Sequence, residues 1–202
     1  MSVVSPVRDL VTFMTSALRA PAVIGAVAPS GRALSDLLAS VAPAEGAPVV
    51  VELGPGTGVV SAALRRRLPP GARHLAVELD PGMVTHLRRT RPWLEVLQGD
   101  AADLQKLLAD AGVDRADAII SGLPWTLFPE SAQRGIIEQV TKVLAPGAPF
   151  TTFAYSHVRS FPTQRRFRGV LEEAFAEVVV TPTVWRNLPP AMAYQCRHPE
   201  DA

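Results

Sequence analysis

Apolar runs and segments with helical spacing alternate along most of this chain. The run Val49-Val50-Val51 before Glu52 is continuous, which is typical of a strand buried on both faces of a parallel sheet. Similar runs predict further strands at 74–78, 93–98, 116–120, 149–154, 177–181 and 192–197. Helical patterns fall between them, at 59–68, 82–90, 130–144 and 163–174. This order predicts an α/β fold with a doubly wound, Rossmann-like, seven-stranded and mostly parallel sheet that carries helices on both faces.

The first 42 residues have a different pattern. Apolar side chains share one stripe of a predicted helix over 5–19, which either packs on the domain or lies in a lipid interface or over the active site. A loop of small residues over 24–32 is expected to cover a ligand, and Ser30 is expected to cap a second helix. We therefore divide the chain into an N-terminal helical segment, 1–42, serving as a lid or membrane contact, and an α/β domain, 43–202.

Composition excludes several classes of protein. The 202 residues are 48% hydrophobic and 19% charged, which suits one globular domain, and a net charge of +1 does not demand a nucleic-acid partner. The single Cys196 excludes an intramolecular disulfide and offers no metal cluster, so no metal is expected. The chain has no apolar run of the ~20 residues that span a bilayer and no signal-peptide pattern, so a cytoplasmic protein is expected.

The turn after the first strand contains three glycines at alternate positions. Glycine allows a sharp turn and a close approach of the backbone to a ligand, and the helix that follows offers free N–H groups. The motif reads Glu52-Leu53-Gly54-Pro55-Gly56-Thr57-Gly58. A strand, a glycine turn and a helix in this order predict a nucleotide-type pocket, although a βα turn without a ligand has the same local pattern.

The spacing of these glycines excludes two common nucleotide motifs. A dinucleotide fingerprint needs Gly or Ala at Val59, and a P-loop needs Gly-Lys-Ser/Thr, which is absent. The motif instead resembles the first motif of class I S-adenosylmethionine (SAM) methyltransferases. That resemblance implies a glycine loop packed against the methionine end of SAM, with Glu52 close to its ammonium group.

Acidic residues follow the next two strands. Glu78 lies 24 residues after Gly54, where a carboxylate can accept both ribose hydroxyls, and Leu79 follows it. Asp100 resembles the methyltransferase position that accepts from the adenine amino group, with the Ala101 N–H facing a ring nitrogen. Asp100 is also a candidate N-cap for a helix from Ala101 onward, and both roles can hold together.

The fourth strand ends in Ser121-Gly122-Leu123-Pro124-Trp125, which should face the methyl group and its acceptor. This segment resembles the Asn-Leu-Pro-Tyr box of adenine-N6 methyltransferases and rRNA adenine dimethylases. Gly122 occupies the Asn position, so the side-chain acceptor for a planar amino group is missing. We therefore expect an acceptor held by backbone and shape, with Ser121 and Leu123 at the reaction centre, while Trp125 and Trp185 either line the acceptor pocket or belong to the core.

Across nearly the whole chain the sequence is similar to the bacterial phospholipid N-methyltransferase family. The similarity rests on the glycine motif, Asp100, the fourth strand end, and the segments Ile24-Gly25-Ala26-Val27-Ala28-Pro29-Ser30 and Asn187-Leu188-Pro189-Pro190-Ala191. It implies SAM-dependent methylation of the phosphatidylethanolamine amine at the inner membrane surface, with S-adenosylhomocysteine (SAH) as product.

Substrate-side candidates lie near the fifth strand and in the N-terminal loop. Tyr155 and His157 are expected to take or relay the proton of the amine, and Ser30, Trp125, Tyr155 and Arg159 to contact the substrate. Arg159 begins a basic cluster with Arg165, Arg166 and Arg168 that suits lipid phosphates, a nucleic-acid backbone or a solvated helix face. Two alternatives to the lipid enzyme are a nucleic-acid methyltransferase and a non-catalytic SAM-binding partner protein.

Overall fold

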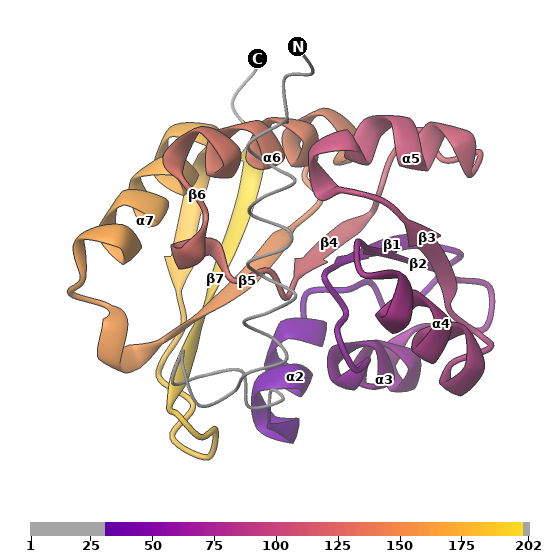
Figure 1. The fold of residues 1–202 in the computed structure, drawn as a ribbon, viewed down its shortest axis with the longest axis horizontal. Coiled ribbons are helices and arrows are strands. Elements are labelled where there is room, and N and C mark those ends of the chain that lie inside the picture. Colours follow the sequence, from indigo (N-terminus) through magenta and orange to yellow (C-terminus); the bar gives the residue numbers. More distant parts are fainter. Residues whose placement is uncertain (1–30, 200–202) are drawn as a thin grey trace, which may run out of the picture.

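A computed structural model describes residues 31–199 and contains one seven-stranded sheet (Figure 1). The strand order is β3-β2-β1-β4-β5-β7-β6. β7 runs antiparallel to both of its neighbours, and the other four strand pairings are parallel. The strands are β1 Val49–Leu53, β2 Arg73–Glu78, β3 Glu95–Gln98, β4 Ala118–Ser121, β5 Phe150–Tyr155, β6 Phe175–Val180 and β7 Ala191–Pro199. The predicted mostly parallel, seven-stranded sheet is confirmed.

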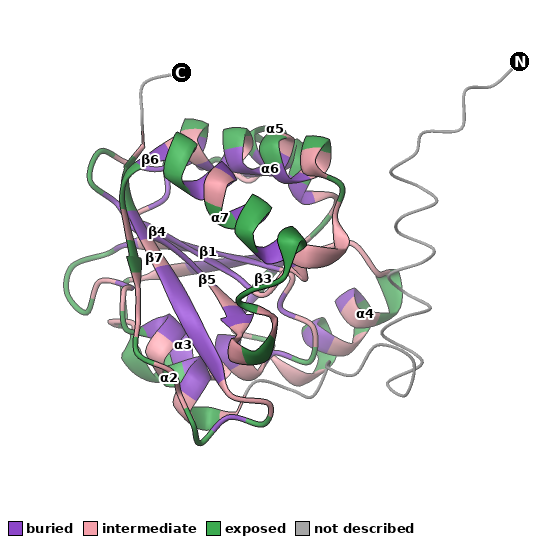
Figure 2. Ribbon diagram, turned by 90° about the vertical axis from the view of Figure 1, so that its left-hand side faces the viewer, coloured by how far each residue is buried: buried purple, intermediate pink, exposed green. Residues whose placement is uncertain are grey.

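Helices cover both faces of this sheet, so the domain has three layers (Figure 2). One face carries α2 Arg32–Ala39, α3 Val59–Arg67 and α4 Pro81–Thr90. The other carries α5 Leu104–Asp110, α6 Glu130–Val143 and α7 Pro162–Ala174. Right-handed crossovers between parallel strands place helices on alternate sides in this way.

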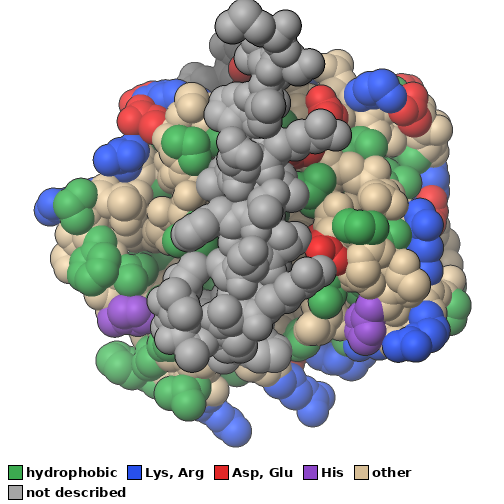
Figure 3. Space-filling model, in the orientation of Figure 1, with side chains coloured by type: hydrophobic (Ala, Val, Ile, Leu, Met, Phe, Trp, Pro, Cys, Tyr) green, Lys and Arg blue, Asp and Glu red, His purple; other side chains and the backbone are tan. Residues whose placement is uncertain are grey.

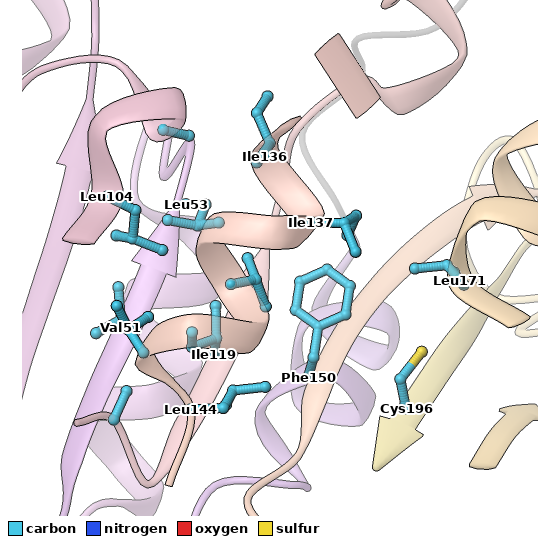
Figure 4. Close-up of a cluster of buried hydrophobic side chains, with 14 of the residues drawn as sticks. Val51, Leu53, Leu104, Ile119, Ile136, Ile137, Leu144, Phe150, Leu171 and Cys196 are labelled. Carbon is cyan, nitrogen blue, oxygen red and sulfur yellow. The ribbon is translucent and has the colours of Figure 1, made fainter. Parts of the chain in front are cut away.

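The apolar run of β1 is buried on both sides. Val51 and Leu53 face α5 and α6, where they meet Ile119 of β4 and Ile136 of α6 (Figure 4). Val50, between them, belongs to the core under α2 and α3. Since successive strand residues point to opposite faces, a central strand needs apolar residues at every position.

The N-terminal prediction is tested only in part. The N-cap residue of α2 is Gly31, one position after the expected Ser30. Ser30 and the predicted helix over 5–19 lie outside the described residues. α2 itself packs as part of the layer beside α3, with Leu34 and Leu38 fully buried. None of the helices described within 31–199 has the length and hydropathy to cross a bilayer.

Candidate active site

The three glycines between β1 and α3 adopt left-handed backbone conformations. Their φ angles are 66° at Gly54, 55° at Gly56 and 77° at Gly58, a region that side chains rarely occupy. The Gly54 N–H donates to the Val77 carbonyl at 3.0 Å, which anchors the loop to β2. A side-chain carbon added at Gly56 would meet nothing within 4 Å. The loop therefore presents bare backbone at the carboxyl end of β1, as a close-fitting ligand requires.

Glu78 connects the end of β2 to this glycine loop. Its Oε2 accepts from the Gly56 N–H at 3.3 Å, and its Oε1 accepts from the N–H groups of Leu79 and Asp80 at 2.9 and 3.0 Å. Burial raises the pKa of the Glu78 carboxyl, and these backbone hydrogen bonds oppose that rise. The carboxylate thus lies beside the loop, in the arrangement expected for binding a ribose next to a methionine tail.

Asp100 lies at the neighbouring strand end. The Gly99 N–H donates to the Glu78 carbonyl at 3.0 Å, which brings the end of β3 against that of β2. The Asp100 Oδ1 accepts from the Ala102 N–H at 2.9 Å and caps the short helix η1, Ala101–Asp103. The capping role is confirmed. A carboxylate has further lone pairs, so capping leaves acceptor capacity for an adenine amino group.

Glu52 lies under the loop, inside the layer of α3. Its side chain is 2% exposed, and its Oε2 accepts from the Ser61 hydroxyl at 2.6 Å and lies 3.2 Å from the Nε2 of His74. The carboxylate therefore ties β1 to the first turn of α3 and lies close to the His74 ring of β2 without a hydrogen bond to it. Contact with the cofactor ammonium stays a prediction. The sequence pattern alone assigns no role beside Glu52 to Ser61 or His74. A polar residue on the buried face of a helix or strand is nevertheless a sign that it has a buried polar neighbour.

Replacing Ser61 with Ala is expected to lower the free energy of unfolding by about 2 kcal/mol, because the buried Glu52 carboxylate would lose a charged hydrogen bond. Urea denaturation measures this change. Thr85→Ala is the matched control, since its exposed hydroxyl donates to a helical carbonyl, and this variant should change stability by less than about 0.5 kcal/mol. Equal stability of the two variants would contradict the proposed role of Ser61.

Gly122 brings the end of β4 against the glycine loop. Its N–H donates to the Leu53 carbonyl at 2.8 Å, and a side-chain carbon at this position would lie 2.6 Å from the Gly54 carbonyl oxygen. Leu123 packs its side chain over Gly54, and its carbonyl accepts from the Trp125 N–H at 3.0 Å. The close approach of the two backbones explains why glycine stands where the adenine enzymes have Asn.

Trp125 belongs to the core, one of the two places expected for it, and is too buried for the expected contact with a substrate. Its side chain is 3% exposed and stacks on Phe167 with ring centroids 4.6 Å apart. Its Nε1–H donates to the hydroxyls of Ser121 and Thr152 at 3.1 and 3.0 Å. A large ring fills the space between the sheet and α7, and its N–H needs buried acceptors. The fully buried Ser121 hydroxyl thus holds the indole, and the roles expected for Ser121 in catalysis and cofactor binding stay predictions.

The remaining acceptor candidates follow β5. Tyr155 is half-buried, and its ring stacks near that of His157 with centroids 5.9 Å apart and a 23° interplanar angle. Burial raises the pKa of the Tyr155 phenol, so this group stays protonated at neutral pH and can orient an amine through a hydrogen bond. His157 lies in the short helix η3, Ser156–Val158, Arg159 is the C-cap residue of that helix, and both are exposed. The structure thus brings Tyr155 and His157 together.

Comparisons with known proteins agree with this geometry. Residues 50–147 match a family model described as a methyltransferase domain. Over 195 residues the chain is 35% identical to the ornithine lipid N-methyltransferase of Singulisphaera acidiphila. This match covers 94% of this chain and 96% of that protein. A 93-residue match of 38% identity to ribosomal RNA small subunit methyltransferase A of Acidithiobacillus ferrooxidans covers 45% of this chain and 33% of that protein. Among solved structures, the O-methyltransferase from Bacillus cereus in complex with SAH has a TM-score of 0.63 at 17% identity, over 97% of this chain and 92% of that one.

Proposed function

Since this chain belongs to the class I SAM-dependent methyltransferases, we propose that it methylates the primary amine of a membrane lipid headgroup. The observation that carries the proposal is the match to the ornithine lipid N-methyltransferase, which runs over nearly the full length of both proteins. It therefore includes the acceptor side of the fold as well as the cofactor side. Phosphatidylethanolamine is the substrate we expect from the sequence, and ornithine lipid is the one in the name of that relative.

The backbone around Gly122 supports a lipid amine over a nucleobase. An adenine acceptor is held by an amide side chain at this position in the enzymes that the segment resembles, and the Gly54 carbonyl leaves no room for one here. The rRNA methyltransferase match covers less than half of this chain. Nucleic-acid methylation is accordingly the alternative that the experiment below must exclude.

The glycine loop, Glu78 and Asp100 suit the methionine, ribose and adenine parts of SAM, which supplies a methyl group activated by a sulfonium. The protein must then hold the amine in line with that methyl group and keep water out; positioning of this kind is worth ~7–11 kcal/mol. The amine must also be neutral to attack. We assign its orientation to Tyr155 and the removal of its proton to the exposed His157, and we place the reaction at the cytoplasmic face of the membrane.

The test is transfer of radiolabelled methyl groups from SAM to defined acceptors. Vesicles containing phosphatidylethanolamine and vesicles containing ornithine lipid form the two lipid arms, and phosphatidylcholine vesicles are the control without an accepting amine. Label in either lipid arm supports the proposal and identifies the headgroup. Label in ribosomal RNA with none in lipid would overturn it in favour of the nucleic-acid enzyme.

A further inference from the structure

The loop between β6 and β7, residues 181–190, exposes two large apolar side chains. Trp185 is 78% exposed and Leu188 is 83% exposed, so Trp185 is not part of the core. Arg186, between them, is exposed as well. Neighbouring apolar side chains held in water in this way mark an interaction surface more often than isolated ones do.

This β6–β7 loop is braced from inside. Val184 and Ala191 form a β-bridge at its base. The buried Asn187 accepts from the Gly31 N–H at 2.7 Å and donates to the Pro189 carbonyl at 2.6 Å. Asn187 is thus buried and hydrogen-bonded, whereas Arg186 and Leu188 on either side of it are exposed, so the exposed side chains stand on a supported backbone.

The loop also lies at the edge of the sheet that holds the active site. β7 is antiparallel to β5 and pairs Ala191 with Tyr155, so the last residue of the loop, Pro190, lies beside the carboxyl end of β5. The Ser156 N–H donates to the Pro190 carbonyl at 2.8 Å, which joins the loop to the segment that carries His157. Figure 1 shows the loop (yellow) below the sheet, next to α2. A surface that the loop touches would therefore face the acceptor side.

The surroundings of the loop are basic. Residues 155–170 and 181–194 contain no Asp or Glu, and their exposed cations are Arg159, Arg165, Arg166, Arg168 and Arg186. Arg166 and Arg168 have partners, in Glu130 at 3.7 Å and Glu172 at 2.8 Å. Figure 3 shows hydrophobic side chains gathered at the lower left of the molecule, with basic ones along the lower margin. Apolar tips within a basic rim complement an anionic lipid surface.

We propose that the β6–β7 loop inserts Trp185 and Leu188 into the interface of an anionic phospholipid bilayer, with Arg186 on the lipid phosphates. Trp favours this depth because its ring is apolar and its N–H can reach water or headgroups. A nucleic acid would use Arg186 but would gain nothing from Leu188. The inference rests on the proposed function, since it brings the acceptor side of the enzyme to the bilayer that holds the lipid amine.

The first test is vesicle binding by the full chain. In cosedimentation, the affinity for vesicles of equal parts phosphatidylglycerol and phosphatidylcholine should fall at least about tenfold in a Trp185→Ser/Leu188→Ser variant. This variant lacks the two apolar side chains that the bilayer would bury. Val179→Ser is the matched control, since Val179 is 45% exposed on β6 outside the loop, and it should bind as the wild type does. Brominated lipids should quench tryptophan fluorescence in the wild type and much less in Trp185→Phe.

Three results would overturn the inference. One is equal vesicle binding by the wild type and the loop variant. Another is a dimer in the absence of vesicles in which Trp185 fluorescence is protected from quenching by acrylamide, which would make the loop a contact between two copies of the chain. The third is salt-sensitive binding of RNA by the wild type and by Val179→Ser that is lost in the loop variant, which would assign this surface to nucleic acid.

A second test separates this inference from the proposed substrate. On an aminolipid dispersed in detergent micelles, the loop variant should turn over like the wild type, whereas on vesicles at limiting lipid it should be at least about tenfold slower. Loop-dependent vesicle binding without methylation of any lipid would overturn the proposed function and leave the inference standing. Normal lipid methylation with loop-independent binding would do the reverse.

Discussion

Replacing Gly122 with Asn is expected to lower the free energy of unfolding by about 3 kcal/mol and to weaken SAH binding at least tenfold. The added side-chain carbon would lie 2.6 Å from the Gly54 carbonyl oxygen. That neighbour is backbone and cannot rotate away, so either β4 or the glycine loop must shift. Urea denaturation and calorimetric titration with SAH measure the two effects.

Two further variants control this prediction. Gly122→Ala adds the same first carbon without a polar group and should show a similar loss, so the result does not depend on whether the Asn variant folds. Gly135→Ala, in α6 where an added carbon meets nothing within 4 Å, should be neutral or stabilising by up to about 1 kcal/mol. Wild-type stability and SAH affinity in both Gly122 variants would refute the close approach of the two backbones.

Replacing Glu78 with Gln is expected to weaken SAH binding roughly a hundredfold. Two ribose hydroxyls that donate to a carboxylate contribute about 1.5 kcal/mol each, and the neutral amide loses most of this. Glu95→Gln is the matched control, because this carboxylate on β3 pairs with Arg73 at 2.7 Å outside the site. It should leave SAH affinity unchanged, and an equal loss in both variants would show that Glu78 has no specific role.

The same carboxylate gives the binding a pH dependence. Since burial raises the pKa of Glu78 above its ordinary 4.5, SAH affinity should fall as the pH falls through that raised pKa, and the Gln variant should lack this step. The effect on stability has the opposite sign. A raised carboxyl pKa means that the buried charge is unfavourable at neutral pH and that this cost is relieved on acidification. Glu78→Gln should therefore be at least as stable as the wild type at pH 7, although it binds SAH more weakly.

Local pattern was enough for the order of strands and helices and for the cofactor side of the site. Apolar residues repeat at different intervals in strands and in helices, so the two can be told apart in the sequence. Backbone positions with left-handed conformations favour glycine, so the spacing of the glycines indicates where the loop turns. Because parallel strands end at one edge of a sheet, the sequence alone predicts that Glu78 and Asp100 lie near the glycine loop. The contact between the Gly56 N–H and Glu78 agrees with that placement.

The acceptor side depended on contacts between distant segments. Trp125 had the same local pattern as a substrate-stacking ring, and only the packing of α7 against β4 and β5 decided that it is buried. The close approach of Glu52 and His74 and the exposure of Trp185 and Leu188 likewise depend on which faces of the elements meet. By itself the sequence determined the fold class and a nucleotide-type pocket, since both follow from local periodicity and spacing, whereas SAM as the cofactor follows from the resemblance of the glycine motif to class I methyltransferases. The tertiary structure decided which side chains remain available to an acceptor, because burial is a property of the assembled layers.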